Sequence, residues 1–245
     1  TGEVTSYGDW TAVDGDDFAA VESPVIVGYT PDVSSVAAVN DVDAAADDLT
    51  EKVTYSVDNQ KANIKYVDET TGDTLKTDPI NGDSNTTSDY STADEIAALE
   101  GQGYELVSDT VPAGGIVFDT DGKTDQSYTV TFKHKTGTTT PTDPDDVNYD
   151  NTHQSVNETI NYVYADGIQA HDPATASLDF TRTVTTDSVT GEVTSYGDWT
   201  AVDGDDFAAV ESPVIVGYTP SQATYKAVNN VTADHGNIVG TITVS

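Results

Sequence analysis

The chain has 245 residues with 43 acidic and 9 basic side chains, so its formal net charge is −34 at neutral pH. Nucleic acids and anionic membranes are both bound through clustered Lys and Arg, and the sequence has no such cluster. We therefore predict no nucleic-acid partner, and no membrane insertion either, because no apolar stretch approaches the roughly 20 residues of a span. The absence of Cys excludes disulfides, thiolate zinc sites and a cysteine nucleophile.

A long internal repeat organises the chain. Residues 1–31 are identical to residues 190–220, at an offset of 189 positions. The alternation of apolar residues then continues to the ends of both copies. The first copy has no counterpart of residues 151–189, so we expect residues 1–56 to be the C-terminal part of a preceding domain of the same type as the second copy.

Residues 57–135 predict a separate domain that opens on a hairpin and closes on a strand. In residues 62–67 apolar side chains alternate with polar ones, and Gly72 suits the positive φ of the turn that follows. Residues 126–135 alternate in the same way, so one face of this strand is expected to be buried.

A helix is predicted over residues 92–101, between the hairpin and the closing strand. Thr92 and Glu95 have the spacing of a capping box, and Gly101 stands where a C-terminal glycine cap is expected.

The rest of the chain predicts a linker and a second domain. Residues 136–150 are rich in Thr, Pro and Asp and predict an extended linker. Within the second domain, residues 151–245, we expect a hairpin that turns at residues 187–191, a short helix over residues 203–212 and an internal strand over residues 213–220.

Both domains thus have the predicted order hairpin, helix, strands. One helix packed on a mixed sheet buries one apolar face of each element. The predicted fold class is α+β, with tandem β-grasp (ubiquitin-like) domains, β-rich and in an elongated arrangement.

The sequence resembles the repeats of a known family. Residues 62–75 and 104–135 resemble the mucin-binding (MucBP) domain of surface adhesins from lactic-acid bacteria. Residues 153–167, 190–202 and 210–220 resemble the second domain of the same mucus-binding repeat. The resemblance implies a secreted, wall-anchored adhesin on the bacterial cell surface that binds host mucin glycans through many weak sites. Two alternatives stay open: an immunoglobulin-binding module that uses a β-grasp edge or helix, and a structural spacer.

No pattern indicates catalysis. The sequence contains no nucleophile elbow, no zinc-protease motif and no phosphate-binding glycine loop, and its four histidines lie far apart. We therefore predict that the protein is not an enzyme and has no organic cofactor.

Ligand-binding candidates are aromatic or basic. Tyr196 and Trp199 lie near the end of a predicted strand, where their faces could stack on sugar rings, and Tyr218 is a third aromatic candidate. The alternative for Trp199 is a place in the core. Lys133 and Lys135 form the one local concentration of positive charge, which could meet a sialic acid or merely end a strand.

Two acidic clusters are candidates for a calcium site, because Ca²⁺ prefers carboxylate oxygens. Because acidic residues are abundant in this chain, each cluster could instead be a solvent-exposed turn that binds no metal. The candidate ligands are Asp119, Asp121 and Asp125 in one cluster, and Asp143, Asp145 and Asp146 in the other.

Overall fold

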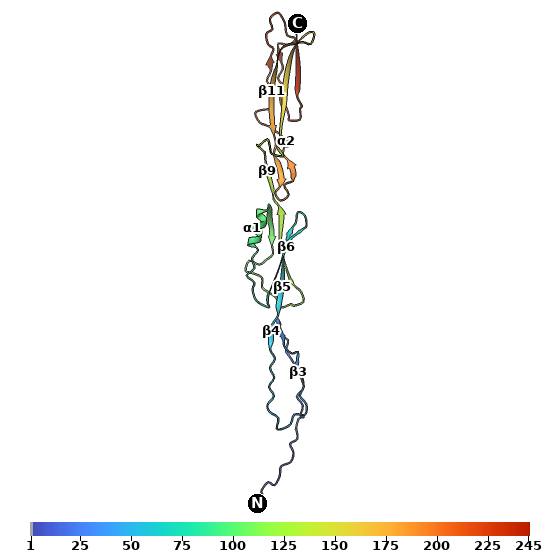
Figure 1. Ribbon diagram of the computed structural model, residues 1–245, viewed down its shortest axis with the longest axis vertical. Coiled ribbons are helices and arrows are strands. Elements are labelled where there is room, and N and C mark those ends of the chain that lie inside the picture. The colour runs from blue at the N-terminus through green and yellow to red at the C-terminus, as the bar shows by residue number, and fades with distance from the viewer. Residues whose placement is uncertain (1) are drawn as a thin grey trace. The chain divides into compact units, whose positions relative to one another are not determined.

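The computed structural model describes residues 2–245 and divides into two compact units (Figure 1). Unit 1 holds residues 2–101 and 105–133, and unit 2 holds residues 102–104 and 134–245. No helix among the described residues has the length and apolar character needed to cross a membrane.

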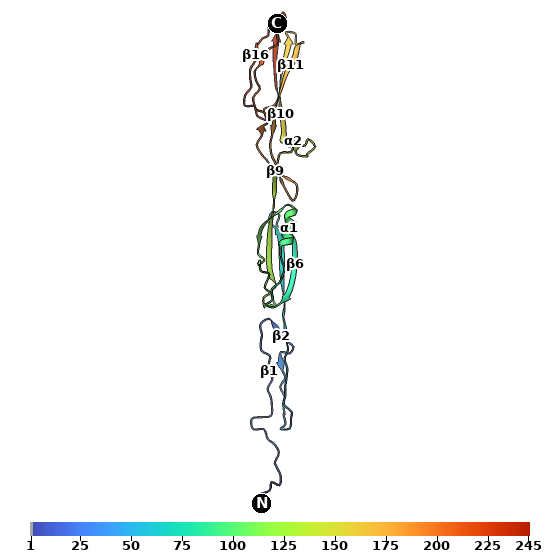
Figure 2. The same ribbon diagram turned by 90° about the vertical axis from the view of Figure 1, so that its left-hand side faces the viewer.

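Unit 1 contains a mixed four-stranded sheet with one helix, α1, beside it (Figures 1 and 2). The strand order is β6-β5-β8-β7, with β5 antiparallel to β6 and parallel to β8. The predicted order hairpin, helix, strands is confirmed in this part of the chain. The elements are β5 (Asn59–Asp68), β6 (Thr74–Asp83), α1 (Ala93–Gly101), β7 (Tyr104–Asp109) and β8 (Gln126–His134).

The alternating residues of β5 and β8 build the core of this sheet. Ile64 and Tyr66 on β5, and Val130 and Phe132 on β8, are fully buried, as the period of two requires. Gly72 has φ of 83° in the turn between β5 and β6, as predicted. Burial on one face therefore fixes the register of both pairings.

The ends of α1 differ from the prediction. The Thr92 hydroxyl donates to the Asp109 carboxylate, and Glu95 forms an ion pair with Lys76, so the capping box is absent. Gly101 is still helical, and it is Gly103 that has the positive φ, 99°. Tertiary partners for Thr92 and Glu95 have replaced the local cap.

Residues 2–58 form two small antiparallel pairs, β1 with β3 and β2 with β4. An isolated pair of backbone hydrogen bonds between Phe18 and Val39 extends the first of them. The strands are β1 (Val21–Glu22), β2 (Tyr29–Pro31), β3 (Ser35–Val36) and β4 (Tyr55–Val57).

Unit 2 is built around a long hairpin, β10–β11. Its main sheet has the order β14-β11-β10-β17, in which β17 runs parallel to β10. A second sheet has the order β13-β12-β9, and β15 pairs with β16. The elements are β9 (Thr136–Thr139), α2 (Tyr149–Thr152), β10 (His153–Tyr164), β11 (Gln169–Thr181), β12 (Val184–Asp187), β13 (Val193–Tyr196), β14 (Thr200–Ala201), β15 (Val210–Glu211), β16 (Thr224–Tyr225) and β17 (Ile238–Val244).

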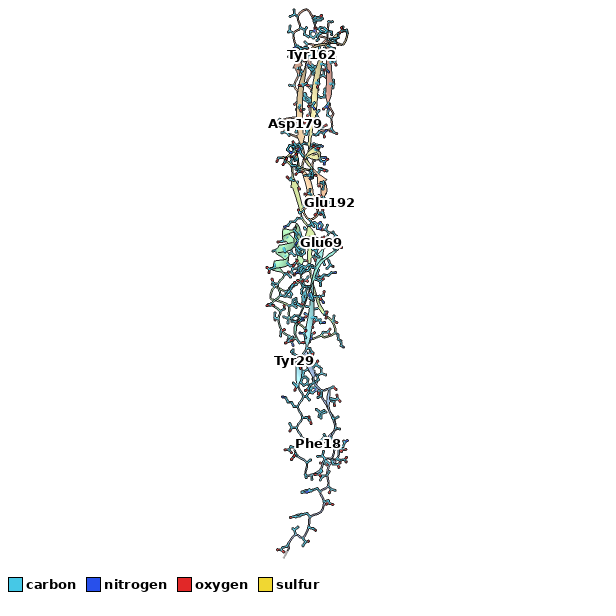
Figure 3. The ribbon with its side chains drawn as sticks, in the orientation of Figure 1. Phe18, Tyr29, Glu69, Tyr162, Asp179 and Glu192 are labelled. Carbon is cyan, nitrogen blue, oxygen red and sulfur yellow. The ribbon has the colours of Figure 1, made fainter. Side chains whose placement is uncertain are left out.

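Two apolar clusters form the core of unit 2, and the inward face of β10 contributes to both. Glu158 lies on the same face of β10 between them, with only 2% of its surface exposed. Tyr162, near the end of this face, is labelled in Figure 3. The clusters are Val156, Phe180, Phe207, Val231 and Ala233 in one, and Ile160, Tyr162 and Ile242 in the other.

Three predictions for this half of the chain are wrong. Residues 203–212 form no helix, because Phe207 and β15 pair with Val228 and β16 instead, and so this part lacks the predicted hairpin–helix–strand order. Residues 213–219 form no strand but an exposed turn around Gly217, whose φ is 85°. Residues 136–139 of the predicted linker form β9, which pairs with β12.

Candidate functional site

Arg182, the only arginine of the chain, lies between β11 and β12. Its backbone N–H donates to Thr152 O at 2.9 Å, which anchors this bend to the end of α2. The pairing of Val184 with Tyr196 and of Thr181 with Thr200 brings β13 and the start of β14 to either side of the bend. The strand register therefore sets which aromatic side chains surround Arg182.

The Arg182 guanidinium packs against two aromatic rings. Its Cζ lies 4.2 Å from the ring centroid of Tyr196 and 4.5 Å from that of Trp199. Its Nε–H donates to Asn151 O at 2.7 Å. Cation–π contacts of this kind contribute about 0.5–2 kcal/mol each, so the side chain is held in one place. We call Arg182, Tyr196 and Trp199 the Arg182 cluster.

The positive charge of this cluster is not neutralised locally. Among residues 2–245, no carboxylate lies within ion-pair distance of Arg182, and no protein acceptor is hydrogen-bonded to its two terminal nitrogens. In a chain with a net charge of −34 this is an unusual local environment. The planar guanidinium presents donors in a geometry that suits a carboxylate.

A surface groove of about 660 Å³ is lined by residues next to the cluster in sequence. One wall is formed by the rings of Tyr149 and His153, which stack with their centroids 3.8 Å apart and an interplanar angle of 8°. Asp150 and Asp179 also line it; Asp179, labelled in Figure 3, accepts a hydrogen bond from the Ser155 hydroxyl at 2.5 Å. The groove thus combines an aromatic wall with hydrogen-bonding groups.

The sequence candidates are only partly brought together. Tyr196 and Trp199 meet at Arg182, and Trp199 also packs against the core beside Phe207, so it is half-buried. Tyr218 contacts Tyr164 at a centroid distance of 4.8 Å and takes no part in the Arg182 cluster.

The predicted basic spot is divided. Lys133 forms an ion pair with Glu105 at 3.4 Å, and Lys135 is exposed. Between them His134 is turned inward, and its Nδ1 lies 2.6 Å from a carboxylate oxygen of Asp187. This hydrogen bond lowers the pKa of Asp187, and so the histidine serves the packing of unit 2.

The candidate calcium ligands form turns. Asp119 accepts from the backbone N–H of Asp121 at 3.1 Å, and Asp143 accepts from that of Asp145 at 3.0 Å. Asp121 and Asp146 likewise accept from the backbone N–H groups of Lys123 and Asn148. Asp125 instead accepts from the side-chain amide of the distant Asn63. In the described residues no group of three or more His, Asp or Glu is placed to hold a metal ion.

Arg182 was not predicted as a site residue, because in the sequence it is simply one of the 9 basic side chains. In the structure a register shift between Thr185 and Thr186 places Tyr196 opposite Val184, two residues from Arg182, and regular extension of the predicted hairpin does not give this pairing.

A second polar cluster, in unit 1, also went unpredicted. The Tyr66 and Tyr90 hydroxyl oxygens lie 2.8 Å apart, and the Tyr90 O–H donates to Asp78 at 2.7 Å. Burial raises the pKa of Tyr90, and the hydrogen bonds with Tyr66 and Asp78 raise it further. Lys76 bridges Asp78 and Glu95, which links β6 to α1. These contacts serve the packing of this sheet.

Comparison with known proteins covers nearly the whole chain. A family described as "Mucin binding domain" matches residues 60–134, and one described as "Muc B2-like domain" matches residues 1–59 and 147–245. No curated protein sequence matches the chain.

Two solved structures cover most of the chain. The crystal structure of Mub-RV is 39% identical, with a TM-score of 0.58 over 76% of this chain and 97% of its own. The type 2 repeat of the mucus binding protein MUB from Lactobacillus reuteri is 35% identical, with a TM-score of 0.54 over 76% of this chain and 98% of its own.

Proposed function

Because the chain belongs to the family of Mub-type repeats, in which a mucin-binding domain is joined to Muc B2-like domains, we propose that it binds mucin glycans at the bacterial surface. The family is one of non-enzymatic adhesin repeats. Within this repeat, we assign the Arg182 cluster as the contact for an acidic sugar.

The observation that carries this proposal is a guanidinium that packs against two aromatic rings and has no carboxylate partner among residues 2–245. Mucin glycans often end in sialic acid, which carries a carboxylate. Arg182 can donate two parallel hydrogen bonds to that carboxylate from its terminal nitrogens. Tyr196 and Trp199 keep the guanidinium plane fixed, so little side-chain entropy is lost when the ligand binds.

The net charge of the chain makes such a local site necessary. A chain of charge −34 repels an anionic glycan, and at physiological salt this repulsion is screened beyond about 8 Å. Contact with an acidic sugar is therefore favourable only where the local charge is positive. The Arg182 cluster meets this condition.

The neighbouring groove suits the neutral sugars of the same glycan. The stacked rings of Tyr149 and His153 offer an apolar face, while Asp179 and Gln154 offer partners for hydroxyl groups. A single open groove of this kind binds weakly. Adhesion then depends on repetition along the parent protein, because several weak sites on one chain raise the avidity.

Binding of the full chain to immobilised mucin tests the proposal. Arg182→Gln removes the guanidinium, and Lys226→Gln is its matched control, because it removes one exposed positive charge from the same unit. We expect the affinity for mucin to fall about tenfold or more in Arg182→Gln, which corresponds to the loss of one charge-assisted hydrogen bond. The affinity of the control should change little. Sialidase treatment of the mucin should weaken binding by the unsubstituted chain. It should leave the binding of the Arg182→Gln variant unchanged.

The two alternatives predict other results. An immunoglobulin-binding module would be captured on immobilised immunoglobulin. Residues 213–219, predicted as a strand, form a turn and offer no strand edge for such a partner. Equal mucin binding by Arg182→Gln and the parent chain would refute the assigned site. Failure to bind both mucin and immunoglobulin would refute glycan binding and leave a structural spacer.

A further inference from the structure

A second pocket in unit 2 is lined by residues of β10, β11 and β15, and it shares no residue with the Arg182 cluster or its groove. Its volume is about 280 Å³, just below the range of about 300–1,000 Å³ that holds drug-sized ligands. Tyr162 lines this pocket and Asp179 lines the groove, and Figure 3 labels both. Asp179 pairs with Ser155, and residues 155–162 of β10 span about 23 Å of strand. The pocket is therefore a separate place on the same hairpin, with room for one small ligand.

A β-bulge shapes the β11 side of the pocket. The register of β10 against β11 shifts between Ile160 and Tyr162, where β11 advances by three residues and β10 by two. The extra residue falls at Asp172 and Pro173, and proline within a sheet is confined to edge strands and bulges. Consecutive residues of a regular strand point to opposite faces, whereas residues 171–174 all line this pocket. The bulge therefore gathers side chains that a regular strand would separate.

The Tyr162 hydroxyl is a buried polar group at this pocket. Only 2% of the residue's surface is exposed, and burial raises the pKa of its phenol. No residue in the range 2–245 forms a hydrogen bond with this hydroxyl, although buried hydroxyls in proteins nearly always have a partner. Glu158 Oε1 is the one side-chain N or O atom of these residues that is both fully enclosed and unpartnered, so the Tyr162 oxygen still reaches solvent. It does so through the pocket that this tyrosine lines.

Three more polar side chains line the pocket. The Nδ1 of His171 lies 2.9 Å from the backbone oxygen of Asp172, which can only accept, so Nδ1 carries a proton and Nε2 of the neutral ring is an acceptor. Asp172 accepts one side-chain hydrogen bond, from the Gln169 amide at 3.2 Å. Glu211 accepts one from the Thr224 hydroxyl at 3.0 Å. Each carboxylate therefore has a second oxygen with which to accept from a ligand.

The remaining walls are apolar, and the charged groups are acidic. Pro173, Val210 and Pro213 give the pocket hydrocarbon surface, and no Lys or Arg lines it. Neither carboxylate forms an ion pair with a basic side chain of the described residues. Local charge therefore opposes an anion, and a small cation would leave the apolar walls unused. Acceptors beside apolar surface suit an uncharged ring with hydroxyl groups on its rim and C–H groups on its face.

We propose that this pocket binds the pyranose ring of one neutral sugar. The Tyr162 hydroxyl bonds to one hydroxyl of the ring, and the carboxylates of Asp172 and Glu211 accept charge-assisted hydrogen bonds from others. The proposal rests on the proposed function for the class of its ligand, a glycan, but it uses other residues than the acidic-sugar site. Contacts at two places on one chain raise its avidity for mucin, and the neutral contact persists when sialic acid is removed.

NMR titration of the ¹⁵N-labelled full chain with methyl β-galactoside and with N-acetylglucosamine, two uncharged sugars, tests the proposal. We expect saturable shifts at residues 171–174 and 210–211. A ligand of about 13 non-hydrogen atoms gives a dissociation constant on the order of 1 mM. This constant should not depend on salt concentration, because the ligand has no charge. Absence of saturable shifts with both sugars would overturn the proposal.

Tyr162→Phe removes only the hydroxyl. Because this hydroxyl has no partner in the protein, the urea midpoint of the variant should stay the same or rise, while its affinity for methyl β-galactoside should fall about fivefold or more. Tyr225→Phe is the matched control, because Tyr225 packs against the same apolar cluster but does not line the pocket. Equal affinities of the two variants, or a lower urea midpoint for Tyr162→Phe without a lower affinity, would overturn the proposal.

The acidic-sugar site can fail independently of this one. Arg182→Gln should bind methyl β-galactoside as tightly as the unsubstituted chain does, whatever its affinity for mucin. Unchanged galactoside binding beside unchanged mucin binding in Arg182→Gln would refute the acidic-sugar site and support the pocket. Sugar-induced shifts at Tyr149 and His153 instead of residues 171–174 would place the neutral sugar in the groove and overturn the proposal.

Discussion

Replacing Glu158 by Leu should stabilise unit 2 at neutral pH. The Glu158 side chain is 2% exposed between two apolar clusters, and its buried Oε1 has no hydrogen-bond partner. A buried polar group without a partner costs about 1–3 kcal/mol. Leu has a similar size and needs no partner, so the free energy of unfolding of the variant should rise by about this amount at pH 7.

The gain should depend on pH. Burial raises the pKa of Glu158 above its ordinary value of 4.5, so the folded chain holds this proton more tightly than the unfolded chain does. Stability from this group is fully present below the unfolded pKa and is lost as the pH rises through the folded pKa. The advantage of Glu158→Leu should therefore grow as the pH increases from 4 to 7.

Urea unfolding followed by tryptophan fluorescence measures this effect. Trp199 packs against the core of unit 2, whereas Trp10 is already 88% exposed, so the signal reports mainly on unit 2. The control is Glu192→Leu, which removes the same charge from an exposed position and should shift stability by less than about 0.5 kcal/mol. A loss of stability in Glu158→Leu at pH 7, or a gain independent of pH, would refute the reasoning.

Two further predictions concern the sheet of unit 1. Tyr90→Phe removes the hydroxyl that donates to Asp78, so the free energy of unfolding should fall by about 1.5–3 kcal/mol; no change in denaturant midpoint would contradict this. Gly82→Ala places a Cβ into the ring of Phe118 and should cost about 1–3 kcal/mol in thermal unfolding, whereas Gly122→Ala meets no atom within 4 Å and should be tolerated. Equal melting temperatures for the two Ala variants would show that the contact at Phe118 is relieved without cost.

Strands with one buried face were predictable because the pattern is local. Residues 62–67 and 126–135 alternate with period two, and that period survives in β5 and β8. The hairpin turns at Gly72 and Gly191 were predictable because glycine accepts a positive φ at little cost. In each case a few adjacent residues carry the whole signal.

Elements whose conformation depends on distant partners were not predictable. Residues 203–212 have acidic residues where a helix would begin, but backbone pairing of Phe207 with Val228 competes with the helix and wins. The apolar run of residues 213–216 predicted a buried strand, whereas Val214 and Val216 are exposed. Weak local propensity is overridden by tertiary pairing in such segments.

The candidate site shows the same division. Tyr196 and Trp199 were candidates because of their residue types. Their partner Arg182 lies in the bend between β11 and β12, at a distance from them in the sequence. Only the register of β12 against β13 brings the three together. The sequence pattern at residues 133–135 likewise gave no sign that His134 turns inward, because this depends on the distant partner Asp187.

NMR of the single arginine tests the central claim most directly. Arg182 is the only arginine, so its Nε–H gives one side-chain signal that needs no assignment by mutation, and its hydrogen bond to Asn151 O slows exchange with water. Titration with a sialylated mucin glycan should shift this signal to saturation, and the desialylated glycan should leave it in place. A signal that stays unchanged while other resonances of the chain shift would contradict the assignment of the Arg182 cluster as the acidic-sugar site.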